Sequence, residues 1–441
     1  MKKLIVIRRY PIPLTSCTQG PHQHTATMSI NAAAAAADKV LGHNPISTGR
    51  TEPQQSSELM HAIVWRGKQD MRYEVVPKPT ISEPHDVLIR VTATTICGSD
   101  LHLYTGELPG MESGDIVGHE FMGIIEEKGS SVQLPLGTRV VVAFDIACGF
   151  CDRCKAGEFT GCETTNPSRV AEEMFGHALC GVFGYGHLVG GYWGGQAEFV
   201  RVPFADVNCL PIPDDVPDEK ALFLSDVICT AYHACEMGEV KPGDSVGIWG
   251  MGPIGLATAR WAQVLGARRV IGISGTEDRL DIAREKLGID VIDYTKQDVL
   301  KTIKEWEPKG LDVCIDAAGF RFAKGMLHKL QRALMLETDT PEIIAECCTA
   351  ARQYGKVSVI ADYAGKANNF PIGTIGMKHL RLESGQSPTQ RIWKMALEKL
   401  RTGEYDPSFL VTHHMRLSDV PAAYKTFYNH EDGMIKIFVR P

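Results

Sequence analysis

The sequence predicts an α/β protein in which a β-rich unit precedes a doubly wound parallel sheet. From Met60 to about Val202, short apolar or alternating segments such as 87–91 and 139–143 are separated by glycine and proline, as in β-strands joined by tight turns. From Ser245 onward, short apolar strands alternate with helical patterns, which favours right-handed βαβ units in a parallel sheet. The expected strands of this second unit are 246–249, 269–273, 291–293, 313–316 and 357–360.

Composition and charge narrow the class of protein. A chain of 441 residues is long enough for two or three domains, each with its own hydrophobic core. A content of 44% hydrophobic and 22% charged residues is ordinary for a globular protein. A formal net charge of -7 without a basic patch argues against a nucleic-acid partner. No apolar run approaches the roughly 20 residues that span a bilayer, so no membrane segment is expected. Thirteen cysteines, an odd number, suggest a reducing compartment rather than a disulfide framework.

Residues 1–58 differ in amino-acid composition from the rest of the chain. Residues 1–37 carry Lys2, Lys3, Arg8 and Arg9 without any acidic residue and end in an alanine run, and a polar stretch comes next. Three interpretations stay open: a mitochondrial targeting extension, a disordered tail, or a gene model that starts too early. We therefore expect a cytoplasmic protein, with mitochondrial import as the alternative.

The most specific motif is a run of four closely spaced cysteines. Cys148, Cys151, Cys154 and Cys162 follow a C-x2-C-x2-C-x7-C pattern within one short loop. Four thiolates at these separations can reach the corners of a tetrahedron about 2.3 Å from a zinc ion, whereas disulfides between such near neighbours would be strained. A four-cysteine site leaves no open coordination position, so this zinc is expected to be structural and the chemistry must lie elsewhere.

A glycine-rich turn follows the first strand of the parallel unit. Gly250, Gly252 and Gly255 form a G-x-G-x-x-G pattern that includes Pro253 and Ile254 and opens a helix. The first glycine permits the tight turn, the second lets a pyrophosphate approach the backbone, and the third allows close packing of helix on strand. The turn therefore predicts a dinucleotide-binding Rossmann unit.

The identity of the dinucleotide stays open between NAD and NADP. The acid that usually holds an NAD ribose would stand at the end of the next strand, where this chain has Ser274. Without that carboxylate a 2′-phosphate is not repelled, and Arg279 is a candidate partner for it. Glu277 or Asp278 could instead reach the ribose, so we expect NAD(P).

The catalytic candidates are spread along the β-rich unit. Cys97, Ser99 and His102 lie within one hexapeptide, and His119 and Glu120 follow a glycine further on. A thiolate and an imidazole are metal ligands, and a hydroxyl and a second imidazole can pass a proton. A lone cysteine or histidine is usually structural, but their order before a four-cysteine loop and a dinucleotide turn favours a catalytic site.

In these motifs the chain resembles the zinc-dependent medium-chain dehydrogenase/reductase family, the zinc alcohol dehydrogenases, over residues 60–441. It is most similar to the glutathione-independent formaldehyde dehydrogenase branch. The resemblance implies that Cys97 and His119 are catalytic-zinc ligands, that Glu120 is the adjacent carboxylate, and that Ser99 and His102 relay the alcohol proton.

The resemblance leaves the third zinc ligand between two residues. The family's ligand, usually a cysteine, aligns with the segment 224–230, where this chain has Asp226, as in the formaldehyde dehydrogenase branch. Cys229 is the alternative, although the motif there places groups beside the nicotinamide, such as Thr230. Asp226 is the preferred assignment.

The resemblance also implies an architecture and a function. It divides the chain into residues 1–58, a GroES-like catalytic domain with the structural zinc loop (59–226), an NAD(P)-binding Rossmann domain (227–383) and a return to the catalytic domain (384–441). The expected protein holds two zinc ions per chain and works as a homodimer or homotetramer.

The expected enzyme transfers a hydride between a small primary alcohol or hydrated aldehyde and NAD(P). A polyol or amino-alcohol dehydrogenase of the same superfamily is the alternative, and a non-catalytic NAD(P)- and zinc-binding protein is a remote one.

One further segment carries an expectation. Residues 163–194 include the stretch 183–193, whose glycine density excludes a regular helix and favours an ordered loop that lies over another part of the molecule. In the formaldehyde dehydrogenase branch that it resembles, an insertion here covers the bound cofactor and slows its release.

Overall fold

The computed structural model describes residues 36–37, 39–42, 54–319, 339–363, 365 and 367–441. Most of the N-terminal segment 1–58 lies outside these residues, so the interpretations of it stay untested. Strand β1 (Gln54–Gly67) begins before Met60, where ordered structure was expected to start, and forms an antiparallel hairpin with β2 (Asp70–Thr80). Among the described residues, none of the helices is long and apolar enough to cross a membrane.

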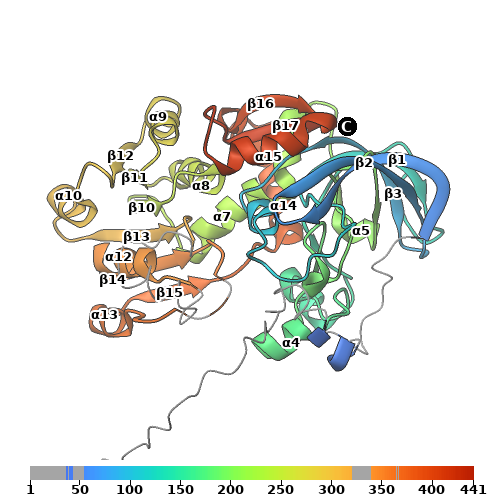
Figure 1. Cartoon of the computed structure of the whole chain (residues 1–441). Coiled ribbons are helices and arrows are strands. Elements are labelled where there is room, and N and C mark those ends of the chain that lie inside the picture. Colours follow the sequence, from blue (N-terminus) through green and yellow to red (C-terminus); the bar gives the residue numbers. More distant parts are fainter. Residues whose placement is uncertain (1–35, 38, 43–53, 320–338, 364, 366) are drawn as a thin grey trace, which may run out of the picture.

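The first unit is built on a β-sheet that the two ends of the chain share. Within the described residues its strand order is β16-β17-β3-β4-β5-β9, with β8 also paired to β3. The strands are β3 (Val87–Thr94), β4 (Phe121–Lys128), β5 (Arg139–Val142), β8 (Phe199–Val202), β9 (Cys209–Pro211), β16 (Val411–Arg416) and β17 (Lys436–Arg440). Because β16 and β17 are C-terminal, the chain returns to its first unit after completing the second (Figure 1).

Short elements complete the first unit. The strands β6 (Asp145–Ile146) and β7 (Gly181–Val182) pair antiparallel beside the cysteine loop. The helices are α2 (Asp100–Tyr104), α3 (Asp152–Lys155), α4 (Val170–Phe175), α5 (Ala205–Asn208), α6 (Asp218–Ala221) and α15 (Val420–Tyr428), with 3-10 turns at η1 (Phe159–Gly161), η2 (His187–Val189), η3 (Leu222–Ser225), η4 (Ser408–Leu410) and η5 (Leu417–Asp419).

The second unit is a parallel sheet with helices between its strands. Its described strands run in the order β12-β11-β10-β13-β14-β15. They are β10 (Ser245–Trp249), β11 (Arg269–Ser274), β12 (Asp290–Asp293), β13 (Leu311–Asp316), β14 (Ala351–Val359) and β15 (Arg381–Ser384). The helices are α8 (Pro253–Val264), α9 (Glu277–Glu285), α10 (Val299–Trp306), α12 (Glu342–Ala350) and α13 (Ile372–Lys378).

The predicted α/β fold class is therefore confirmed, including the five strands expected in the parallel sheet. The strand order reverses at β10, and ligands of such sheets bind at the carboxyl ends of the strands beside that reversal. The glycine turn that follows β10 lies at this point.

Two helices join the sheets and carry much of the core. Helix α7 (Val227–Met237) lies between the two sheets in Figure 1, and α14 (Thr389–Arg401) brings the chain back from the second unit to the first. Trp261 of α8 anchors this junction, because its ring stacks on Tyr405 at 4.5 Å and meets the edge of Tyr232 at 5.1 Å. The indole also donates a 2.9 Å hydrogen bond to the carbonyl of Ile228, so the junction is fixed by both packing and polar contacts.

Candidate active site

The four cysteines of the predicted zinc loop converge. Their sulfur atoms all lie within 4.8 Å of one another, and the Sγ atoms of Cys148 and Cys154 are 3.8 Å apart. The backbone amides of Phe150 and Cys151 donate to Cys148 Sγ at 3.4 and 3.3 Å. Such amide contacts stabilise thiolates, and a metal needs thiolates rather than thiols as ligands. The loop therefore has the donor set and spacing of a closed tetrahedral zinc site.

A second group of ligand atoms assembles from distant segments. Cys97 precedes α2, His119 and Glu120 precede β4, and Asp226 lies between η3 and α7. One ligand atom from each of the four lies within 4.8 Å of the others, and all four residues are buried. Buried thiol, imidazole and carboxylate groups at this spacing can bind a divalent metal such as zinc.

Two residues that the sequence analysis did not single out hold this group in place. The buried carboxylate of Asp100 accepts the Cys97 amide at 2.9 Å through Oδ2, and its Oδ1 lies 3.0 Å from Nδ1 of His119. The Lys436 ammonium, fully buried on β17, pairs with Glu120 Oε1. Asp100 stands inside the Cys97–His102 hexapeptide, so its position was a usable signal, whereas nothing in the local sequence around Lys436 pointed to a site more than 300 residues away.

The electrostatics of the group call for a cation. Within the part of the chain that the structure describes, the buried Oε2 of Glu120 accepts no hydrogen bond. Burial raises the pKa of Cys97 and of Glu120, although the Lys436 charge opposes both shifts. Burial acts against the charged form of His119, but the charge and hydrogen bonding of nearby Asp100, with further hydrogen bonds, hold its pKa well above the usual value. In the forms that bind a metal, a Cys97 thiolate and a neutral His119, three carboxylates and the thiolate surround one lysine, and a divalent cation would neutralise the negative charge that is left.

The geometry at the third ligand position separates the two candidates. Asp226 Oδ2 lies 3.4 Å from Nε2 of His119, and Thr230 Oγ1 donates to Asp226 Oδ1. Burial acts to raise the pKa of Asp226, but the hydrogen bond and charge of His119 outweigh it and the net pKa is lowered. Cys229 instead donates its thiol to the carbonyl of Leu224 at 3.4 Å and is not one of the four clustered ligands.

The two proposed relay residues occupy different surroundings. Ser99 Oγ lies 3.5 Å from Nε2 of His119, beside the ligand atoms. His102 is buried in α2, and its Nδ1 lies 3.1 Å from Glu107 Oε2. The structure thus brings Ser99 to the ligand group, while the described ring contact of His102 runs outward to Glu107.

The glycine turn after β10 has the geometry that its spacing predicted. Gly250 adopts φ +97°, which favours glycine. A side chain on Gly255 would lie 1.7 Å from the carbonyl oxygen of Gly250, so only glycine fits there. A Cβ on Gly252 would meet only the Arg279 guanidinium, at 3.9 Å. Pro253 is the first residue of α8, and Ile254 packs against the core behind it. The turn leaves backbone amides at the start of a helix free to meet a phosphate.

The end of β11 carries no carboxylate. Ser274 is buried there, and its Oγ accepts the amide of Thr276 at 3.3 Å. The Arg279 guanidinium lies beside Gly252 and contacts Nδ1 of His430 at 3.1 Å. Glu277, one of the alternative ribose partners, is instead paired with Lys296 at 2.6 Å.

The glycine-rich segment 183–193 lies against the ligand group. A side chain on Gly184 would lie 2.6 Å from the amide of Gly118, so the segment packs directly on the turn that carries His119. The ring of Tyr185 meets His119 edge-on at 5.7 Å, and its hydroxyl lies 3.4 Å from the carbonyl of Ser99. The segment therefore lies over the site as an ordered loop.

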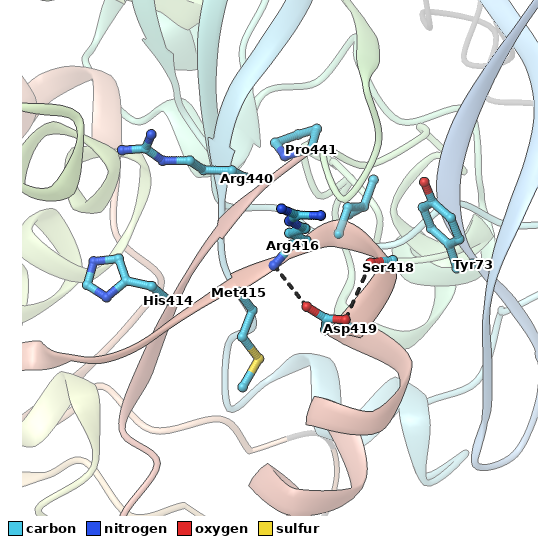
Figure 2. A pocket seen from close by; sticks show the side chains of 9 residues that line it. Tyr73, His414, Met415, Arg416, Ser418, Asp419, Arg440 and Pro441 are labelled. Carbon is cyan, nitrogen blue, oxygen red and sulfur yellow. Dashed lines mark hydrogen bonds between the residues drawn. The ribbon is translucent and has the colours of Figure 1, made fainter.

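A surface pocket lies apart from this site, at the end of β16 (Figure 2). Its lining residues are Tyr73, His414, Met415, Arg416, Leu417, Ser418, Asp419, Arg440 and Pro441. No residue of either ligand group lines this pocket, so it plays no part in the chemistry derived from them.

Family models, related sequences and solved structures all resemble this chain and all come from zinc-type alcohol or formaldehyde dehydrogenases. The family model of the alcohol dehydrogenase GroES-like domain matches residues 83–214, and that of the zinc-binding dehydrogenase matches residues 253–337. A zinc-type alcohol dehydrogenase-like protein of Schizosaccharomyces pombe is 50% identical over 91% of this chain and 96% of its own length.

A glutathione-independent formaldehyde dehydrogenase of Pseudomonas aeruginosa is 31% identical over 86% of this chain and 96% of its own. Among solved structures, the alcohol dehydrogenase TADH from Thermus sp. ATN1 superposes with a TM-score of 0.73 at 32% identity, covering 86% of this chain and 99% of that one.

Proposed function

The chain belongs to the zinc-binding alcohol dehydrogenase family, and from that premise we propose that it transfers a hydride between a small primary alcohol or hydrated aldehyde and NAD(P). The chain is an oxidoreductase of the medium-chain type, with a GroES-like domain and a Rossmann domain. The observation that carries the proposal is the convergence of Cys97, His119, Glu120 and Asp226 on one buried point.

We assign Cys97, His119 and Asp226 as ligands of a catalytic zinc, with Glu120 as the adjacent carboxylate. Two observations support this assignment: the buried Glu120 Oε2 accepts no hydrogen bond among the described residues, and three carboxylates and a thiol gather around the one ammonium of Lys436. The second zinc is assigned to Cys148, Cys151, Cys154 and Cys162, where it would fix the loop between β6 and β7.

The roles of the chain's own residues follow from their positions. A zinc ion in the first site would supply Lewis-acid stabilisation of negative charge on the substrate oxygen, and the nicotinamide would accept the hydride. Ser99, whose Oγ lies 3.5 Å from Nε2 of His119, would take the hydroxyl proton of the substrate, and His102 with Glu107 would pass it outward. Asp100 orients His119, and Lys436 holds Glu120.

The coenzyme is proposed to bind along the carboxyl edge of the parallel sheet. The turn from Gly250 to Gly255, with Pro253 and Ile254, would hold the pyrophosphate. Ser274 and Arg279 would face the adenosine ribose, and Thr230 the nicotinamide. The glycine-rich segment 183–193 is proposed to cover the bound coenzyme.

We propose a catalytic domain made of residues 59–226 and 384–441 around a Rossmann domain at 227–383, and a homodimer or homotetramer. Two features support an assembly. Strand β15 is the last strand of its sheet among the described residues, and Ile372 and Met377 on the neighbouring helix α13 expose 72% and 80% of their surface.

We propose that the protein works in the cytoplasm. The twelve cysteines among the described residues form no disulfide, which supports a reducing compartment. Import into a mitochondrion directed by residues 1–58 is the alternative, and localisation of the full chain and of a chain starting at residue 59 distinguishes the two.

The direct test is a panel of short alcohols and hydrated aldehydes, with NAD and NADP, followed by absorbance of the reduced nicotinamide. We expect coenzyme reduction with at least one short primary alcohol. Coenzyme binding without reduction by any member of the panel would instead favour a non-catalytic binding protein.

A further inference from the structure

Tyr185 is the residue of the glycine-rich segment 183–193 that reaches the mixed ligand group. Its ring meets the His119 ring edge-on, with 5.7 Å between the two ring centroids. Its hydroxyl donates to the carbonyl of Ser99 at 3.4 Å, and Ser99 Oγ lies 3.5 Å from Nε2 of His119. Tyr185 therefore contacts both a proposed zinc ligand and the residue proposed to take the substrate proton.

The backbone on both sides of Tyr185 is pressed against other segments. On one side Gly184 has φ +59°, and a Cβ on it would lie 2.6 Å from the amide nitrogen of Gly118. On the other side Gly186 has φ +82°, and a Cβ on it would lie 2.9 Å from the carbonyl oxygen of Gly110. Only glycine fits at these two positions, and this close packing fixes the direction in which the Tyr185 side chain leaves the backbone.

The ring of Tyr185 is also supported by packing. It lies against the buried cluster that contains Met111 and against the one that contains Phe144. The segment is anchored again two residues further on, where the amide of His187 donates to the carbonyl of Gly110 at 2.7 Å. A ring held in this way can move only by losing these contacts, so Tyr185 is a fixed wall rather than a mobile lid.

The exposure of the surrounding residues shows from which side a substrate can reach the ligand group. Glu120 and Lys436 expose 1% and 0% of their surface, which closes the side that they occupy. Ser99, Tyr185 and Thr230 are partly exposed, and Thr230 is proposed to face the nicotinamide. A substrate whose oxygen lies at the metal and within reach of Ser99 would therefore extend its carbon chain past the Tyr185 ring.

We propose that Tyr185 is a specificity-determining residue whose ring limits the bulk of the group that a substrate alcohol carries beyond its reacting carbon, so that short unbranched alcohols are oxidised in preference to bulky ones. This inference rests on the proposed function. The ring acts through its size, because its hydroxyl is engaged by the Ser99 carbonyl. In an apolar pocket one methylene group changes kcat/KM by about 10- to 200-fold, which sets the scale of the effect.

The test measures kcat/KM of the zinc-loaded enzyme with propan-1-ol and with cyclohexylmethanol, two saturated primary alcohols that differ in bulk. The wild type should favour propan-1-ol. Tyr185→Ala removes the ring and should raise the ratio of kcat/KM for cyclohexylmethanol to that for propan-1-ol by about 10- to 100-fold. Tyr185→Phe is the matched control, since it keeps the ring, loses only the hydroxyl and should retain the wild-type ratio.

Zinc content and thermal unfolding establish that the variants are folded. Tyr185→Leu, which keeps an apolar but shorter side chain, should raise the ratio as well and serves if Tyr185→Ala loses zinc. An equal fall in kcat/KM for both alcohols with zinc retained would mean that the ring only supports His119 and Ser99, and would overturn the proposal.

Two other results would overturn the proposal. One is an unchanged ratio in folded Tyr185→Ala, which would place the substrate chain away from the ring. The other is a rise in Tyr185→Phe as large as in Tyr185→Ala, which would assign the effect to the hydroxyl. Failure of the coenzyme-bound wild type to oxidise any alcohol would instead contradict the proposed function itself.

Discussion

The two ligand groups of this chain differ in how the fold builds them. The four cysteines come from one loop of 15 residues, spanning 148–162, and are all of one type. The second group joins Cys97, His119, Glu120 and Asp226, the last of which lies more than 100 residues beyond the others, and it mixes sulfur, nitrogen and oxygen. A local set of four thiolates closes around its metal, whereas a mixed set at the junction of two units leaves room for a substrate. Loss of the first should therefore damage folding, and loss of the second should damage turnover.

The largest effect is expected from breaking the cysteine loop. Cys162→Ser should lose one zinc and unfold at a much lower temperature, because a structural zinc contributes on the order of 10 kcal/mol to the folding of small zinc domains. Thermal unfolding with metal analysis measures this. Cys180→Ala is the matched control, since this buried cysteine packs in the same cluster but is not one of the four ligands. Equal destabilisation by both variants would show that packing, not metal, holds the loop.

The second largest effect is expected at the mixed site. Asp226→Ala should lower kcat by about a thousandfold or more while coenzyme affinity stays close to normal, because Lewis-acid stabilisation is commonly worth several kcal/mol. Stopped-flow turnover and coenzyme titration measure the two quantities. Cys229→Ala should retain the catalytic zinc. The opposite pattern, with zinc lost from the Cys229 variant and kept in the Asp226 variant, would reverse the ligand assignment.

A smaller effect is expected at Asp100, which contacts the zinc ligand His119 rather than the metal itself. Asp100→Asn should lower zinc affinity at the mixed site or kcat by about 10- to 100-fold, because partners of a metal-bound histidine usually matter by this factor. Glu107→Gln, which contacts His102 rather than His119, should leave zinc affinity unchanged. Competition with a chromophoric chelator measures the affinity. An unaltered affinity in Asp100→Asn would remove this residue from the account.

The smallest effect is expected at the coenzyme. Ser274→Asp adds a carboxylate at the end of β11, which can accept the ribose 2′-hydroxyl and repel a 2′-phosphate. The ratio of NAD to NADP efficiency should rise by about tenfold, as measured by kcat/KM with each coenzyme. If the ratio does not move, Arg279 or another group must make the discrimination.

The contrast between the two ligand groups also explains what could be predicted from the sequence. The cysteine loop is local, so its spacing was sufficient. The parallel strands and the turn at Gly250 were equally readable, because each depends on neighbouring residues. Lys436 reaches the site only through tertiary structure, because it lies on the C-terminal strand β17. A single lysine at such a position carries no local pattern, so no sequence argument could have found it.

We propose that one zinc site stabilises the fold and the other serves catalysis. This proposal is tested most directly by measuring the zinc content of the purified, active protein and of the two ligand variants. We predict about two zinc ions per active wild-type chain, and about one in both Cys162→Ser and Asp226→Ala, with stability lost in the first and turnover lost in the second. Zero or one zinc ion per chain in fully active wild-type enzyme would contradict the account.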